Sequence, residues 1–145
     1  MKQQNLHTIG RIELVDLPEW GIEGIEAKID TGAYSSSLHC HHIEEFDRSG
    51  KAFVRFNLLD PEHPAYNEQL FELPIFDKRD VKSSNGVSET RFFVQTGISF
   101  FGEIYRIEFS LTDRSEMKYP LLIGRKFLKN KFVVDVSKKN LSQKL

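Results

Sequence analysis

The feature that most constrains the fold is a succession of short alternating stretches separated by turn residues. Apolar and polar residues alternate in segments such as 9–15, 22–29 and 104–111, and a period of two is typical of strands with one buried face. Many short strands at this spacing favour a closed barrel or a sandwich. We therefore expect an all-β fold in a single domain of residues 1–145, with a polar, frayed tail over 136–145.

Length and charge exclude several classes of function. The chain has 145 residues, which fits one domain. Its formal net charge is −1, so the chain lacks the excess of positive charge that is typical of proteins that bind nucleic acid or an anionic membrane. The start of the sequence has no apolar run typical of a secretory signal, and no apolar stretch approaches the ~20 residues of a bilayer span. The single cysteine, Cys40, fits a reducing compartment, so we expect a cytoplasmic protein.

An acidic residue stands at the end of one predicted strand. Ile25, Ala27 and Ile29 share one face of that strand, which runs directly into Asp30-Thr31-Gly32. Glycine permits a sharp turn and the close approach of another backbone. The strand thus places one carboxylate at the mouth of a tight loop.

A second motif lies near the C-terminus. Residues 119–123 are mainly apolar and end in Ile123-Gly124-Arg125. The pattern predicts a buried strand over 121–123, a single helical turn over 125–130, and a last strand over 132–136.

Together the two motifs resemble the retropepsin-like aspartic peptidases, in which an apolar-apolar-Gly-Arg segment passes through the loop formed by Asp-Thr-Gly-Ala. The match also includes Gly10-Arg11, Leu17-Pro18 and residues 36–39, and it spans about residues 10–135. It is similar to a bacterial branch labelled "ATP-dependent zinc protease". The resemblance implies a closed acid-protease (retropepsin-like) barrel with one short C-terminal helix.

The resemblance also implies roles for single residues. Asp30 is the catalytic acid, the Thr31 hydroxyl locks two active-site loops across a dimer axis, and the Gly32 carbonyl accepts a hydrogen bond from the substrate. Ala33 stands where two-lobed enzymes carry a hydroxyl that donates to the carboxylate; alanine cannot donate, so we expect a pH optimum nearer neutral. Ile123, Gly124 and Arg125 form the structural motif that passes through this loop.

Aspartic peptidases use two carboxylates about 3 Å apart that share one proton. The ionised carboxylate takes a proton from water, and the protonated one polarises the scissile carbonyl. This chain has one Asp-Thr-Gly. We therefore expect a homodimeric peptide hydrolase in which each copy contributes Asp30, because a twofold axis brings the same residue together from both sides.

A hairpin between the two motifs occupies the place of the family's flap. Asn85-Gly86 between extended arms is a strong hairpin signal, so Ser84, Asn85 and Gly86 are, together with Ala33, the candidate substrate-binding residues. A plain solvated turn is the alternative interpretation.

Two residues depart from the viral pattern. Lys28 stands where an apolar residue is usual, and Tyr34 stands where viral enzymes place the acid that pairs with the arginine of Gly-Arg. The Arg125 side chain therefore needs a different hydrogen-bond or ion-pair partner, and the candidates are Asp60, Asp77 or a main-chain carbonyl.

The run His39-Cys40-His41-His42 raises the alternative of a zinc-dependent hydrolase. On a regular strand His39 and His41 share one face, with Cys40 and His42 on the other. Zinc needs at least three protein ligands, and neither His7 nor His63 has a spacing that supplies the third. The sequence also contains no His-Glu-x-x-His and no phosphate-binding Gly-x-x-x-x-Gly-Lys-Ser/Thr. We therefore expect no metal and no cofactor.

The resemblance suggests a substrate and a partner. The family is associated with RimK-type ATP-grasp glutamate ligases, which points to a glutamate-extended peptide or protein as the substrate. A cationic cleft rim would suit such a chain, and Lys78, Arg79, Lys82 and Arg91 flank the predicted flap. Acidic residues lie among them, so the plainer interpretation is a solvated hairpin of mixed charge. A non-catalytic peptide-binding module with the same fold also remains open.

Overall fold

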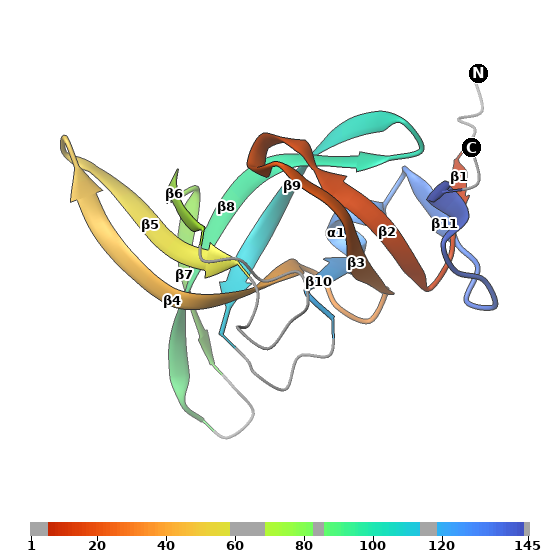
Figure 1. Ribbon diagram of the computed structural model, residues 1–145. Coiled ribbons are helices and arrows are strands. Elements are labelled where there is room, and N and C mark those ends of the chain that lie inside the picture. The colour runs from red at the N-terminus through yellow and green to blue at the C-terminus, as the bar shows by residue number, and fades with distance from the viewer. Residues whose placement is uncertain (1–5, 59–68, 83–85, 114–118, 144–145) are drawn as a thin grey trace, which may run out of the picture. The chain divides into compact units, whose positions relative to one another are not determined.

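The computed structural model describes residues 6–58, 69–82, 86–113 and 119–143. Most of these residues lie in strands, and the one α-helix among them is a single turn near the C-terminus, which confirms the expected all-β class (Figure 1). None of the helices formed by the described residues has the length and apolar character that a bilayer span requires. In chain order the elements are β1 (His7–Ile9), β2 (Ile12–Leu17), η1 (Pro18–Trp20), β3 (Ile22–Asp30), β4 (Ser36–Arg48), β5 (Lys51–Leu58), β6 (Leu70–Pro74), β7 (Asp77–Lys82), β8 (Ser88–Phe100), β9 (Glu103–Thr112), β10 (Leu121–Gly124), α1 (Arg125–Leu128), β11 (Phe132–Val134) and η2 (Leu141–Gln143).

The chain divides into two compact units. Unit 1 comprises Met1–Ser36, Thr96–Ile107 and Tyr119–Leu145, and unit 2 comprises Ser37–Gln95 and Glu108–Lys118. Strands β4, β8 and β9 each contribute residues to both units. The Asp-Thr-Gly and Gly-Arg motifs both belong to unit 1.

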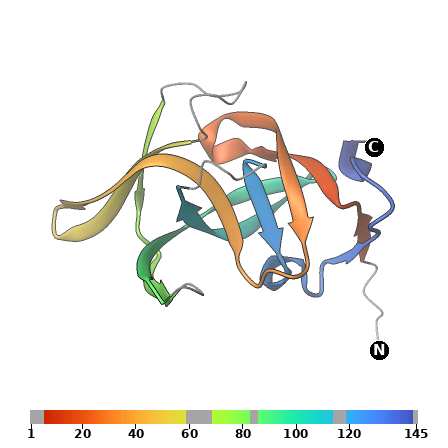
Figure 2. The same ribbon diagram turned by 90° about the horizontal axis from the view of Figure 1, so that it is seen from below.

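Strand β3 lies between two partners in unit 1. It pairs with β2 in antiparallel fashion on one side and with β10 in parallel on the other, where Gly124 lies opposite Asp30. Figure 2 shows β10 (blue) beside the end of β3 (orange), both running in the same direction. The side chains of Ile25, Ala27 and Ile29 are buried, as their alternation predicts.

An aromatic cluster holds α1 in unit 1. The ring of Phe132 lies 5.3 Å from that of Phe100, 5.5 Å from Tyr105 and 5.9 Å from Phe127, measured between centroids. A four-residue helix has no stability of its own in water. Burial of Phe127 and Leu128 therefore anchors α1, and with it the Gly-Arg motif at its start.

Strand β8 differs from its prediction. Glycine commonly interrupts a strand, so the sequence predicts a turn at Gly97, but β8 continues from Ser88 to Phe100. A side chain at Gly97 would begin 2.7 Å from the Glu19 carboxylate and 3.2 Å from Ile104. Glycine therefore serves here as a site of close approach within a strand, which is its other common role in sheets.

The C-terminal segment also differs, since the tail expected to fray over 136–145 is docked through most of its length. The buried carboxylate of Glu13 on β2 accepts hydrogen bonds from the backbone N–H groups of Gly10 at 2.7 Å, Leu141 at 3.1 Å and Ser142 at 2.9 Å. A polar and basic composition suggested fraying, but the hydrogen bonds of the backbone, which composition does not reveal, hold this segment.

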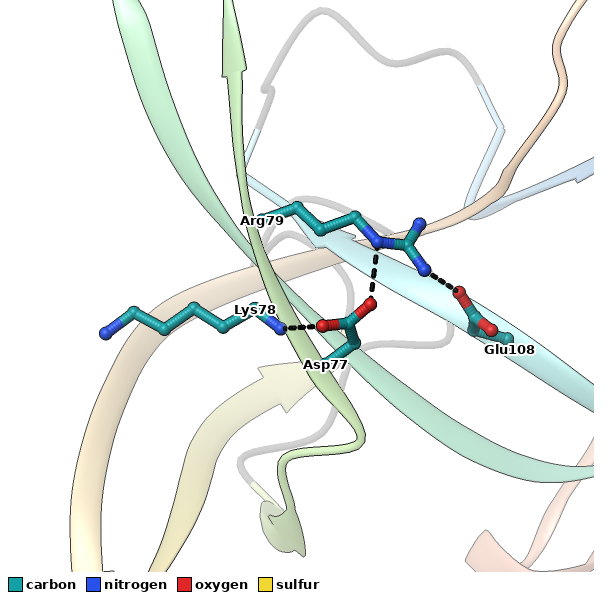
Figure 3. A network of polar contacts seen from close by, with 4 residues as sticks. All are labelled: Asp77, Lys78, Arg79 and Glu108. Atoms are coloured by element: carbon teal, nitrogen blue, oxygen red, sulfur yellow. Dashed lines mark hydrogen bonds and ion pairs between the residues drawn. The ribbon is translucent and has the colours of Figure 1, made fainter.

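In unit 2, β5 pairs with β4 and β6, and β7 pairs with β8, all in antiparallel fashion. Charged side chains link β7 to β9. The Arg79 guanidinium donates to the Asp77 carboxylate at 2.7 Å and to Glu108 at 3.3 Å (Figure 3). Asp77 also accepts a hydrogen bond from the backbone N–H of Lys78, so its carboxylate is engaged within unit 2.

Candidate functional site

Asp30 stands at the end of β3, at the entrance to a tight turn. The backbone N–H of Gly32 donates to the Asp30 carboxylate at 3.0 Å, and that of Ala33 donates to the Asp30 carbonyl at 3.2 Å. Asp30 is half-buried, whereas Thr31 and Gly32 are exposed. The turn thus orients the carboxylate and leaves it accessible.

The junction of β10 and α1 braces the segment that follows this turn. The backbone N–H of Arg125 donates to the Ala33 carbonyl at 2.8 Å, and that of Lys126 donates to the Tyr34 carbonyl at 3.0 Å. The N–H of Gly124 donates to the Ser36 hydroxyl at 3.0 Å. Three consecutive N–H groups therefore hold the loop against the end of β10, where β3 and β10 run in parallel.

The Arg125 side chain completes the brace. Its Nη1 donates to the Gly32 carbonyl at 3.1 Å and lies 3.4 Å from the Thr31 carbonyl. Of the three partners that the sequence left open, the structure thus selects main-chain carbonyls. Asp77 binds Arg79 instead (Figure 3), and Asp60 lies outside the described residues.

This brace affects the predicted role of Gly32. The Gly32 carbonyl, expected to accept a hydrogen bond from a substrate, already accepts one from Arg125. A carbonyl oxygen has two lone pairs, so one remains for a ligand. The role of Thr31 across a dimer axis, and that of Ala33, stay predictions.

Two residues contribute more than the sequence indicated. Ser36 is buried, and its hydroxyl accepts from Gly124; the sequence offered it only as part of a family pattern. The ring of Tyr34 is 56% exposed and lies 5.5 Å from the Arg125 guanidinium carbon and 5.9 Å from the Lys126 ammonium. The two cations therefore lie over the ring of Tyr34. Tyr34 occupies the sequence position where viral enzymes place an acid.

The arms of the predicted flap pair as expected. Strands β7 and β8 form an antiparallel ladder that ends with Lys82 opposite Ser88. Gly86 has φ +85°, a conformation that favours glycine. Ser84 and Asn85 lie outside the described residues, so the substrate-binding role of Ser84, Asn85 and Gly86 stays a prediction.

The histidine run does not follow regular alternation. His39 and Cys40 are both buried, and the register of β4 shifts after His41, where His42 has φ +55°. As a result the rings of His41 and His42 lie side by side, 4.1 Å apart, so the expected placing of these two histidines on opposite faces is wrong. A β-bulge of this kind adds one residue and redirects the side chains that follow it.

Among the described residues, the surroundings of this run show no arrangement typical of a metal centre. The described residues contain no group of three or more His, Cys, Asp or Glu side chains placed to hold a metal ion. The Nδ1 of His42 is hydrogen-bonded to Asn57 at 3.0 Å, and that of His41 lies 3.8 Å from the Asp113 carboxylate. Burial raises the pKa of the Cys40 thiol well above its ordinary value, which disfavours the thiolate that a metal would need.

The chain is similar to a known protein family and to a solved structure. A family described as "Retropepsin-like aspartic endopeptidase RimB" matches residues 8–145. A crystal structure of a Legionella pneumophila protein of unknown function has a TM-score of 0.77 and 27% sequence identity, over 95% of this chain and 99% of that chain.

Curated relatives are longer proteins. A probable α-L-glutamate ligase of Shewanella pealeana is 37% identical over 137 residues, which make up 92% of this chain and 29% of the ligase. A protein of the same name from Desulfotalea psychrophila is 34% identical over 131 residues, 88% of this chain and 27% of the ligase. The chain therefore spans less than a third of the length of these relatives.

Proposed function

Because the chain belongs to the RimB-like family of retropepsin-like aspartic endopeptidases, we propose that it is a peptide hydrolase that acts as a homodimer. Each copy contributes Asp30 to a pair of carboxylates that activates one water molecule. The observation that supports this proposal is the braced loop: Asp30 is oriented by Gly32 and held in place through Arg125.

A single copy contains half of such a site. In the part of the chain that the structure describes, the Asp30 carboxylate bonds to the Gly32 N–H and to no second carboxylate. Peptide hydrolysis of this type needs two, one ionised and one protonated. A twofold axis beside the exposed loop would bring the second Asp30 into place.

The chemistry follows from the shared proton. The ionised Asp30 takes a proton from the trapped water as its oxygen attacks the scissile carbonyl, and the protonated Asp30 of the other copy donates to the carbonyl oxygen. The resulting tetrahedral intermediate collapses with protonation of the leaving amine. Water adds across the C–N bond, and the two carboxyl groups again share one proton.

We further propose that the substrate is a peptide or protein extended with glutamate residues. The curated relatives are named as glutamate ligases, and about 29% of the length of one of them corresponds to this chain. A hydrolase joined to, or working beside, such a ligase would act on the bonds that the ligase forms. The proposed functional partner is therefore a glutamate ligase.

The test is a cleavage assay with glutamate-extended and plain peptides. We expect Asp30→Asn to reduce the rate by at least about a hundredfold while peptide binding is retained, since general acid–base catalysis contributes about 10²–10⁴-fold. Thr8→Val, an exposed change on β1, is the matched control.

Two outcomes would contradict the proposal. Unchanged hydrolysis by Asp30→Asn would exclude the dyad, and loss of activity on addition of a chelator would indicate a metal hydrolase. Peptide binding without any hydrolysis by the unaltered chain would instead identify a binding module of the same fold.

A further inference from the structure

A lysine precedes the proposed catalytic acid by two residues on the same strand. Lys28 stands where viral enzymes carry an apolar residue, and the proposed function gives it no role. Successive side chains of a strand point to opposite faces, so Lys28 and Asp30 share one face of β3. Ala27 and Ile29, on the other face, are buried in the core. Two residues of a strand span about 7 Å, so Lys28 lies beside the proposed reaction centre.

The strands on both sides of β3 place apolar side chains next to Lys28. Ile12 on β2 and Leu122 on β10 are its register partners, and residues opposite each other in a sheet share a face. Both are half-buried, whereas Lys28 is exposed. The strand is therefore not an edge, and its outer face presents a cation between two apolar contacts. A glutamate side chain has the same two-part character, with two methylene groups followed by a carboxylate.

The charge of Lys28 is not held by an acid of its own chain. Two acids, Glu26 and Asp30, lie on the same face of β3, one on each side of Lys28 along the strand. Among the residues that the structure describes, the Lys28 ammonium has no hydrogen-bond or ion-pair partner, and neither of these acids pairs with it. Its three N–H donors can therefore bind a carboxylate brought by a ligand.

The cations of the β7–β8 hairpin differ in this respect. Three of the four that the sequence placed around the predicted flap are paired with acids at 2.7–3.3 Å, namely Lys78 with Glu45, Arg79 with Asp77 and Glu108, and Arg91 with Glu89 (Figure 3). The side chain of the fourth, Lys82, lies outside the described residues. The cationic rim that the sequence suggested on this hairpin is thus largely neutralised.

We propose that Lys28 is a specificity-determining residue whose ammonium binds the side-chain carboxylate of a substrate glutamate beside the scissile bond, while Ile12 and Leu122 contact its methylene groups. This inference rests on the proposed function. A twofold axis that brings two copies of Asp30 together also brings two copies of Lys28, one on each side of the scissile bond. The pair would then select a bond that has glutamates on both sides.

Binding is tested with the full chain carrying Asp30→Asn, so that peptides are not consumed. The probes are two peptides that differ only in four residues, which are glutamates in one and glutamines in the other. We expect the glutamate peptide to bind at least about tenfold more tightly, and Lys28→Gln to remove about tenfold of that preference. Lys28→Arg should retain it, because the charge is kept. Lys139→Gln, a change of an exposed lysine in the C-terminal segment, should leave it unaltered.

Kinetics with an intact Asp30 provide a second readout. Lys28→Gln should raise KM for the glutamate peptide about tenfold and preserve kcat, because the reacting groups are untouched. If Lys28 instead positioned Asp30, kcat would fall for both peptides alike. Glu26→Gln should tighten the binding of the glutamate peptide, since it removes a like charge from the same face of β3.

Salt supplies a measurement that needs no variant at Lys28. The preference of the Asp30→Asn chain for the glutamate peptide should decline as the salt concentration rises, because exposed charges are screened. A preference that does not change with salt would contradict the proposal even if Lys28→Gln failed to fold.

The role of Lys28 is also overturned if both peptides bind equally, if Lys28→Gln keeps the preference, if Lys139→Gln removes as much of it, or if Lys28→Gln lowers kcat for both peptides. A chain that shows the expected binding preference but hydrolyses neither peptide would overturn the proposed function alone.

Discussion

At the scale of single residues, the position of the Asp30 loop depends on the absence of a side chain at Gly124. A Cβ atom there would lie 2.5 Å from the Ser35 carbonyl oxygen and 2.7 Å from that of Tyr34. Both contacts are with backbone atoms, which cannot turn aside as a flexible side chain can. Gly124 has an extended backbone that any residue could adopt, so the requirement is for space and not for conformation.

Gly124→Ala should therefore displace the loop. We expect a loss of about 1–3 kcal/mol in the free energy of unfolding from overpacking and a fall in kcat/KM of about tenfold to a hundredfold from misplacement of Asp30. Gly102→Ala is the matched control: its φ of +76° is strained for alanine, yet a Cβ there meets nothing within 4 Å. Equal losses of activity in the two variants, at similar stability, would contradict this account.

At the scale of elements, a buried acid joins β2 to the C-terminal segment. Glu13 is fully buried, and its two carboxylate oxygens accept three backbone N–H groups, one from the turn before β2 and two from η2. A buried carboxylate is tolerated when its charge is satisfied by donors. Gly10 assists, because a side chain there would collide with the backbone at Lys138.

Glu13→Gln should destabilise the chain although it preserves the volume of the side chain. The amide nitrogen of glutamine cannot accept a hydrogen bond, so at least one N–H donor would face another donor. We expect a loss of about 1–3 kcal/mol, measured as a lower urea midpoint, with Glu26→Gln, an exposed glutamate on β3, as the control. The same midpoint for both variants would show that the docked tail contributes little to stability.

At the scale of the whole molecule, the proposed activity requires two copies of the chain. If two Asp30 residues form one site, a mixed dimer of an unaltered chain with an Asp30→Asn chain should be inactive. At a one-to-one ratio after subunit exchange, about a quarter of the dimers carry two intact acids. The activity should then fall to about half of that given by the same amount of unaltered chain alone.

Sedimentation velocity at the assay concentrations supplies the control for this mixing experiment, because exchange requires a reversible dimer. Activity that stays proportional to the unaltered chain, whatever the excess of the variant, would show that each copy works alone.

The sequence predicted the local parts of this protein well. Alternation at Ile25, Ala27 and Ile29 predicted the buried face of β3, and the Gly-Arg motif predicted the strand and helical turn of β10 and α1, since these patterns reflect which side chains one segment buries. The predicted turn at Gly97 and the predicted face of His42 were wrong for one reason. The backbone at Gly97 stays extended and leaves room for the Glu19 side chain, and the bulge at His42 arises where β4 pairs with β5. Both features therefore depend on neighbouring segments and not on the segment that contains the residue.

The sequence by itself determined that short strands would present one acid at the end of β3, because periodicity and glycine act over a few residues. Only the tertiary structure decided what surrounds that acid. Positions far apart in the chain are joined by three contacts: Arg125 with its carbonyl partners, the Ser36 hydroxyl with Gly124, and residues 138–142 with the segment they dock against. Such contacts depend on distances and directions in three dimensions, which neither composition nor spacing along one strand contains.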